Sequence, residues 1–228
     1  MKSLLLIIFI FANLYSSDSF NKLQLGQEIF EETCMVCHGG NGDGMINQKY
    51  NLIVNPRVLN RSLLDEEQIY KIIKKGAHYW GAYADIMPSF ENVYNEEYLR
   101  AISFYVHKRY YNSEIEDEIK KLLKGTNNFT KDQQNKMIEV GQEAYNNDCA
   151  ICHGISGHGD GELTIDPALK IYPYDLTKSF LKDDQIFLYL KYGAKYWGGA
   201  KYEMPAWSGK YDDYTLRSVV KYIREVLR

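Results

Sequence analysis

The chain has 228 residues, 45% of them hydrophobic and 25% charged, which is an ordinary composition for a globular protein and a length that allows one large domain or two small ones. A formal net charge of -3 provides no basic footprint for nucleic acid or for an anionic membrane, so no nucleic-acid partner is expected. Aromatic residues make up 14% of the chain, which suits either a protein that encloses a flat apolar group or a simple bias in residue usage.

The first residues predict an export signal. Lys2 is followed by an apolar stretch from Leu4 to Leu14, which is shorter than the roughly 20 residues that span a bilayer. We therefore expect a signal peptide over residues 1–18, a periplasmic protein, and no stable membrane span after cleavage. Tyr15 disturbs the small-residue pattern before the cleavage region, so an uncleaved anchor is the alternative.

The segment that follows predicts helices joined by long loops and contains no convincing alternating strand pattern. We expect a first helix over residues 22–38 and a third over about 95–110. Between them, a second helix should begin at Asp65, whose carboxylate can cap it together with Gln68, and should stop at Gly76. The fold class is therefore all-α.

A polar stretch over residues 112–135 predicts a linker. Ile115, Ile119 and Leu122 recur in it at helical spacing, so part of the linker should be an amphipathic helix. Beyond it, helices are expected over residues 142–152, 183–192 and 212–227.

The two halves of the chain repeat one another. Gly42-Asp43-Gly44 falls on Gly159-Asp160-Gly161 after a two-residue shift, and the matching then continues toward the end of the chain. We interpret the chain as a tandem duplication, with domain 1 over residues 19–111 and domain 2 over residues 136–228. Three helices in each copy are too few to close a core unaided, so a buried cofactor should supply the missing apolar mass.

Each copy holds one C-x-x-C-H motif. At a helix end, the two thiols can bond the vinyl groups of a haem while the histidine ligates its iron. A zinc site would need a second pair of ligands nearby, and neither a thioredoxin-type dithiol nor a structural disulfide needs the histidine. The motifs predict two covalently bound haem c groups, attached through Cys34, Cys37, Cys149 and Cys152, with His38 and His153 as axial ligands.

The sixth iron ligand should recur at the same place in both copies. Met87 and Met204 do so, and each precedes a proline, which stiffens a loop. The rival histidines have no counterpart in the other copy, where His78, His107 and His158 are matched by Lys195, Arg224 and Asn41. We therefore predict Met87 and Met204 as the second axial ligands, with core packing as the alternative role.

These motifs resemble those of a dihaem class I c-type cytochrome. The order of C-x-x-C-H-G, G-D-G, a loop proline, a helix ending in glycine, Met-Pro and a final helix is similar to the haem domains of cbb3-type oxidase subunits, and the overall size is similar to proteins of the cytochrome c4 kind. The resemblance covers both repeats and leaves out the signal and the linker.

The resemblance implies further contacts. A glycine and an aromatic residue on the first helix should cross an aromatic residue on the last, and the ligating histidine should donate to a carbonyl near a loop proline. The crossing residues would be Gly26, Phe30 and Tyr105, and Gly141, Tyr145 and Tyr222. The residues expected to line the haem pockets are Pro56, Tyr79, Trp80, Pro173, Tyr196 and Trp197, with generic core packing as the alternative for the aromatic ones.

We expect an electron carrier rather than an enzyme, with a protein donor and a protein acceptor in a respiratory chain as partners. The alternatives are a dihaem enzyme, such as a peroxidase or a sulfur-compound dehydrogenase, or its electron-accepting subunit. An enzyme needs an open or displaceable iron position with acid–base groups nearby, and methionine at both irons argues against one. The sequence shows no oxidase-type membrane anchor, which favours a diffusible carrier.

Overall fold

The computed structural model describes residues 18–44, 56–82, 87–110, 113–166, 169, 172–198 and 204–228. Within these ranges no residue lies in a β-strand, which confirms the all-α prediction. The predicted signal peptide lies outside them except for Asp18. In the same ranges, no helix combines the length and the apolar character needed to cross a membrane.

The described residues of domain 1 form three main helical segments. The first covers residues 18–29 and continues through a π-helical turn, η1 (Phe30–Cys34), into the short α2 (Met35–His38). After the 3₁₀ turn η2 (Leu59–Arg61) come α4 (Glu66–Tyr79) and α5 (Glu96–Tyr110).

The second helix begins and breaks where the sequence predicts. The Asp65 carboxylate accepts from the Gln68 backbone N–H, and the Gln68 side chain accepts from the Asp65 N–H, which completes the capping box. Gly76 has φ 76° and interrupts the helical backbone, after which one more turn runs to Tyr79. A side chain at this φ would be strained, so glycine is needed for the break.

Domain 2 repeats this order. Its described residues form α7 (Lys131–Ala144), η3 (Tyr145–Cys149), α8 (Ala150–His153), the 3₁₀ turns η4 (Glu162–Thr164) and η5 (Leu176–Lys178), α9 (Asp183–Tyr196) and α10 (Asp213–Glu225). The predicted start of its first helix, at residue 142, is too late. Thr130 and Gln133 form a capping box that starts α7 at Lys131, within the stretch interpreted as linker.

The first and last helices of each domain cross at a glycine. In domain 2, Gly141 lies against the Ser218 carbonyl, and the Tyr145 and Tyr222 rings are 5.3 Å apart between centroids. The predicted crossing is confirmed in both domains, since the corresponding residues of domain 1 are Gly26, Phe30 and Tyr105.

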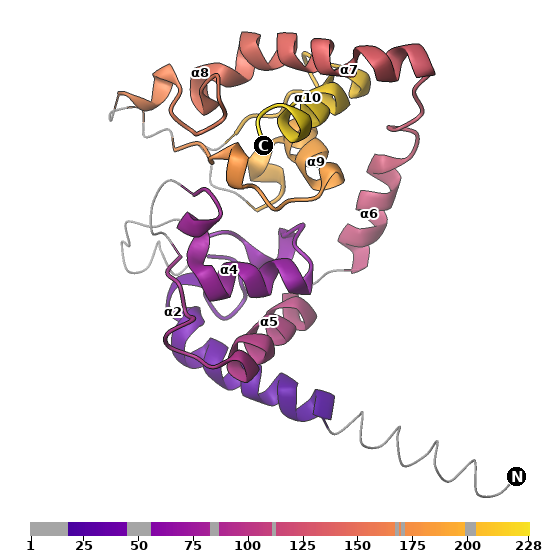
Figure 1. The fold of residues 1–228 in the computed structure, drawn as a ribbon. Helices are drawn as coiled ribbons and strands as arrows, with labels where there is room; N and C mark the ends of the chain where they lie inside the picture. The colour runs from indigo at the N-terminus through magenta and orange to yellow at the C-terminus, as the bar shows by residue number, and fades with distance from the viewer. Residues whose placement is uncertain are drawn as a thin grey trace, which may run out of the picture.

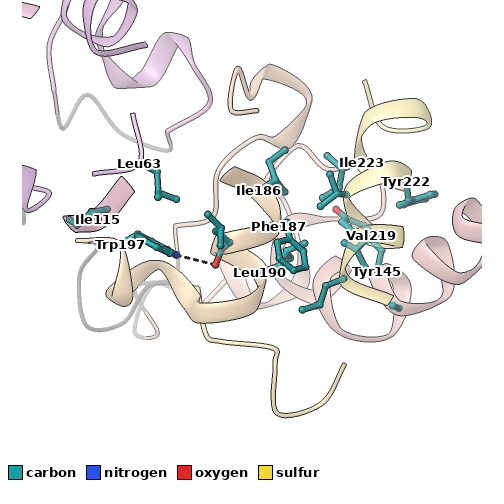
Figure 2. Packing of buried hydrophobic residues seen from close by; sticks show 14 residues of the cluster. Leu63, Ile115, Tyr145, Ile186, Phe187, Leu190, Trp197, Val219, Tyr222 and Ile223 are labelled. Carbon is teal, nitrogen blue, oxygen red and sulfur yellow. Dashed lines mark hydrogen bonds between the residues drawn. The ribbon is translucent and has the colours of Figure 1, made fainter. Parts of the chain in front are cut away.

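The core of domain 2 extends to the domain boundary. Leu63 of domain 1 and Ile115 of the helix between the domains, α6 (Ser113–Leu123), belong to the same buried cluster as Trp197 (Figure 2). The Trp197 indole N–H donates to the Leu188 carbonyl across 3.1 Å, which satisfies its polar atom inside this apolar cluster.

The two domains lie side by side, with α6 running along one flank from domain 1 toward domain 2 (Figure 1). Ile119, Leu122 and Leu123 of α6 pack against the domain 2 cluster. The helix between the domains is therefore part of the packed structure.

Candidate functional site

Each C-x-x-C-H motif closes the first helix of its domain. The π-helical turns η1 and η3 stand immediately before α2 and α8, and each motif is followed by a glycine with positive φ, Gly39 at 72° and Gly154 at 76°. A π-helical turn inserts one extra residue per turn and so rotates the residues that follow about the helix axis. The same device orients the motif in both domains.

None of the four cysteines forms a disulfide. Burial raises the pKa of Cys34 to about 12, with the neighbouring Cys37 adding to the effect. Burial raises the pKa of Cys149 to about 12 as well, with Asp148 as the next cause. A dithiol that carries out disulfide exchange needs a lowered thiol pKa, so these pairs do not have the electrostatics of a thioredoxin-type site.

The histidines of the motifs face backbone carbonyls. His153 Nδ1 lies 3.0 Å from the Tyr174 carbonyl. The Arg57 backbone takes the equivalent place beside His38, but there the contact is looser and Nδ1 falls short of ordinary hydrogen-bond geometry. Burial lowers the pKa of both imidazoles, and the carbonyls offset this only in part. Because a carbonyl can only accept, Nδ1 of the neutral His153 ring carries the proton and Nε2 presents a lone pair.

These carbonyls lie where the resemblance predicts. Tyr174 directly follows Pro173, and Arg57 directly follows Pro56. Each predicted proline thus directly precedes the carbonyl beside the histidine. The contact of Pro56 and Pro173 with a haem stays a prediction.

The glycine loop after each histidine corrects the sequence alignment. Gly44 N–H donates to the His38 carbonyl across 3.0 Å, and Gly159 N–H donates to the His153 carbonyl across 2.9 Å. Gly44 therefore corresponds to Gly159, and the two extra residues of domain 2 follow this glycine instead of preceding it. The alignment by G-D-G was wrong because the backbone requires glycine at positive φ, 65° and 78° here, whatever residue precedes it.

The methionine loops are fastened to the broken ends of α4 and α9. Ala77 N–H donates to the Met87 carbonyl and Ala194 N–H donates to the Met204 carbonyl, each across 2.9 Å. Met87 packs against the same buried cluster as Cys34, and Met204 against the same cluster as Cys149. Each domain therefore brings its motif and its methionine to one core.

The predicted aromatic residues divide into two groups. Trp197 is 1% exposed and lies at the domain boundary. Trp80 lies there too, and the centroid of its ring is 4.7 Å from the centroid of the Phe180 ring. Tyr79 is 57% exposed and Tyr196 is 38% exposed, and the Tyr196 hydroxyl donates a hydrogen bond to the Glu118 carboxylate. Contact of these four aromatic residues with a haem stays a prediction. The contact of the two tryptophans with the other domain is a feature that the sequence does not indicate.

The residues present fit a covalently attached haem in each domain. Each site offers two cysteine thiols separated by two residues, a neutral imidazole beside a backbone carbonyl, and a methionine on the same core. In the described part of the chain, no group of three or more histidine, cysteine or acidic side chains is arranged to hold a metal ion directly. The two C-x-x-C-H motifs are therefore the candidate sites.

Residues 21–106 and residues 136–223 each match the family described as Cytochrome C oxidase, cbb3-type, subunit III. No curated protein matches the chain. It is similar to a solved chain of the Kuenenia stuttgartiensis reducing HAO-like protein complex Kustc0457/Kustc0458, with 20% identity, a TM-score of 0.44, and coverage of 90% of this chain and 96% of that chain. Both segments that match the family contain one C-x-x-C-H motif and one Met-Pro pair.

Proposed function

Because the chain belongs to the family of cbb3-type cytochrome c oxidase subunit III, with two cytochrome c domains in tandem, we propose that it is a periplasmic dihaem cytochrome that passes single electrons between redox proteins of a respiratory chain. The observation that carries this proposal is repetition. The attachment motif, the backbone carbonyl beside its histidine, and a methionine on the same core recur in both domains. The apolar stretch from Leu4 to Leu14 supports export.

The residues have separate roles in this proposal. The cysteine pairs would hold the two haems covalently, with His38 and Met87 as axial ligands in domain 1 and His153 and Met204 in domain 2. When bound, haem iron takes up and releases one electron, and thioether ligation raises its potential. The Tyr174 carbonyl keeps the His153 imidazole oriented, so that ligation there needs little rearrangement.

Replacement of the methionines tests the ligation. In the oxidised wild-type protein we expect the weak far-red absorption of sulfur-ligated ferric haem. Met87→His and Met204→His should each remove about half of that absorption and lower the potential of one haem, because imidazole favours ferric iron more than thioether does. Optical redox titration of the purified holoprotein measures both quantities.

Met137→Leu is the control, because Met137 is buried but has no methionine at the equivalent position of domain 1. It should keep the absorption and both potentials. An unchanged spectrum and potential in Met87→His would refute methionine ligation. Rapid turnover of hydrogen peroxide or thiosulfate by the wild-type protein would instead identify an enzyme with a displaceable ligand.

A further inference from the structure

The domains meet through backbone hydrogen bonds that are exchanged between equivalent residues. Val58 N–H donates to the Gly198 carbonyl across 2.9 Å, and Asp175 N–H donates to the Gly81 carbonyl across 2.8 Å. Val58 and Asp175 directly follow the residues whose carbonyls face the two histidines, and Gly81 and Gly198 end the two Tyr-Trp-Gly turns. The contact therefore has the pseudo-two-fold symmetry of an isologous dimer interface.

Side chains on both sides of this interface follow the same symmetry. Trp80 packs against Phe180 of domain 2, and Trp197 shares a buried cluster with Leu63 of domain 1. Each Tyr-Trp-Gly turn is thus anchored in the other domain by its tryptophan.

The starts of α4 and α9 face each other at the centre of the interface. The side-chain amides of Gln68 and Gln185, both buried, exchange two hydrogen bonds of 2.8 Å. Beside them, Lys182 Nζ lies 2.7 Å from Asp65 Oδ2. Two copies of domain 1 would place two aspartates at this position, and two copies of domain 2 would place two lysines, so the charges favour pairing of the two different halves of the chain.

One peptide group joins this interface to each histidine. The carbonyl that accepts from His153 Nδ1 belongs to Tyr174, and the N–H that donates to the Gly81 carbonyl belongs to Asp175, the next residue. These are the two ends of a single rigid, planar peptide unit. The peptide between Arg57 and Val58 stands in the same way between His38 and Gly198, with the looser contact to its histidine.

We propose that these two peptide groups couple the haem sites, so that the potential of each haem depends on the other domain being in place. This inference rests on the proposed function, because it assumes that His38 and His153 ligate iron. Hydrogen bonds in a chain polarise one another, so donation to the Gly81 carbonyl makes the Tyr174 carbonyl a stronger acceptor. A stronger acceptor makes the imidazole more basic, which favours ferric iron and lowers the potential.

Alanine at Gly81 tests the coupling from across the interface. A Cβ at this position would lie 2.5 Å from the Asp175 carbonyl oxygen, so Gly81→Ala, made in domain 1, should open the bond to Asp175. We expect the potential of the domain 2 haem to rise. Gly198→Ala is the mirror variant, since its Cβ would lie 2.5 Å from the Val58 carbonyl oxygen. It should raise the potential of the domain 1 haem by a smaller amount, because the contact with His38 is looser.

Redox titration of the full-length holoproteins with soluble mediators gives both potentials, and the Met87→His shift assigns one of them to domain 1. Gly125→Ala is the matched control. Gly125 has φ 78°, so alanine is strained there as at Gly81, but the nearest atom to its Cβ would be 4.0 Å away. Its two potentials should equal those of the wild type.

A rise in the haem of the opposite domain, and not in Gly125→Ala, supports the coupling. Unchanged potentials in both interface variants, with two haems bound and the far-red absorption intact, would overturn it while leaving the proposed function standing. If the glycine variants do not fold, Lys182→Asp is the alternative test. It places a second carboxylate opposite Asp65, so the domains should separate and both potentials should rise. A wild-type protein without histidine-ligated haem would refute the proposed function itself.

Discussion

Gly141 lies where α7 crosses α10, and it leaves no room for a side chain. A Cβ built there would overlap the Ser218 carbonyl oxygen and lie 3.0 Å from the Tyr222 Cβ. The backbone of a packed helix cannot move aside as a flexible side chain can, so we expect Gly141→Ala to lower the free energy of unfolding by about 1–3 kcal/mol. Urea unfolding followed by circular dichroism measures the change.

Gly209→Ala is the control for this prediction, because no atom lies within 4 Å of a Cβ at that position. Its free energy of unfolding should stay within about 0.5 kcal/mol of the wild-type value. Equal losses in the two variants would show that the helices do not cross as closely as the structure has them.

The site residues differ in how far the sequence predicts them. The C-x-x-C-H motifs and the methionines are predicted from their spacing and repetition, since both can be read from the sequence. The roles of Trp80 and Trp197 do not follow, because nearness to a methionine in sequence says nothing about which side of the turn faces the other domain. The carbonyl beside His153 could be foreseen from Pro173, but its link to Gly81 could not.

At the scale of elements, α6 packs into the junction between the domains. Its Ile115 is 7% exposed and lies in the cluster that also contains Leu63 and Trp197 (Figure 2). Truncation would leave a cavity between three separate elements, so we expect Ile115→Ala to lower the free energy of unfolding by about 2–5 kcal/mol. Chemical unfolding measures the loss, and limited proteolysis of the segment after α6 should become faster.

Lys120→Ala on the same helix is the matched control. The Lys120 side chain is 64% exposed and pairs with Glu116 and Asp117 of its own helix. Its removal should change the free energy of unfolding by no more than about 0.5 kcal/mol. If Ile115→Ala were equally mild, α6 would be a tether and not a packed part of the molecule.

The sequence predicts elements best where a local signal starts or ends them. Asp65 with Gln68 starts α4, and Gly76 breaks it, because capping and positive φ are decided within a few residues. No cap or glycine in the sequence marks the π-helical turns η1 and η3, each of which ends at the first cysteine of its motif. The capping box at Thr130 is also a local signal, but it lies in a polar stretch that favours a linker.

At the scale of the molecule, the duplication predicts two equivalent modules but not their arrangement. Gln68 and Gln185 are far apart in the chain, and nothing in the sequence around either residue predicts that their side chains pair. One pair of matching positions in the repeats is consistent with the observed arrangement. Asp65 and Lys182 are equivalent and oppositely charged, as expected of residues that meet on a pseudo-two-fold axis.

The acid sensitivity of the molecule should depend on this ion pair. Burial raises the pKa of Asp65, but hydrogen bonds from the Lys182 ammonium and the Gln68 N–H, together with the charge of His107, bring it below its ordinary value of 3.8. A carboxyl whose pKa is lowered by folding stabilises the protein fully above its unfolded pKa, and this stabilisation is lost as the pH falls through the folded pKa. The free energy of unfolding should therefore contain an acid-dependent contribution from Asp65.

Asp65→Asn isolates that contribution, because asparagine caps a helix about as well as aspartate but carries no charge. Urea unfolding at a series of pH values, from above 3.8 downward, should show a smaller loss of stability in Asp65→Asn than in the wild type. In a Lys182→Gln background the effect of Asp65→Asn on this pH dependence should shrink, since the partner that lowers the pKa is gone. Parallel pH curves for wild type and Asp65→Asn would mean that the two charges do not meet, and the selectivity for pairing unlike domains would lose its basis.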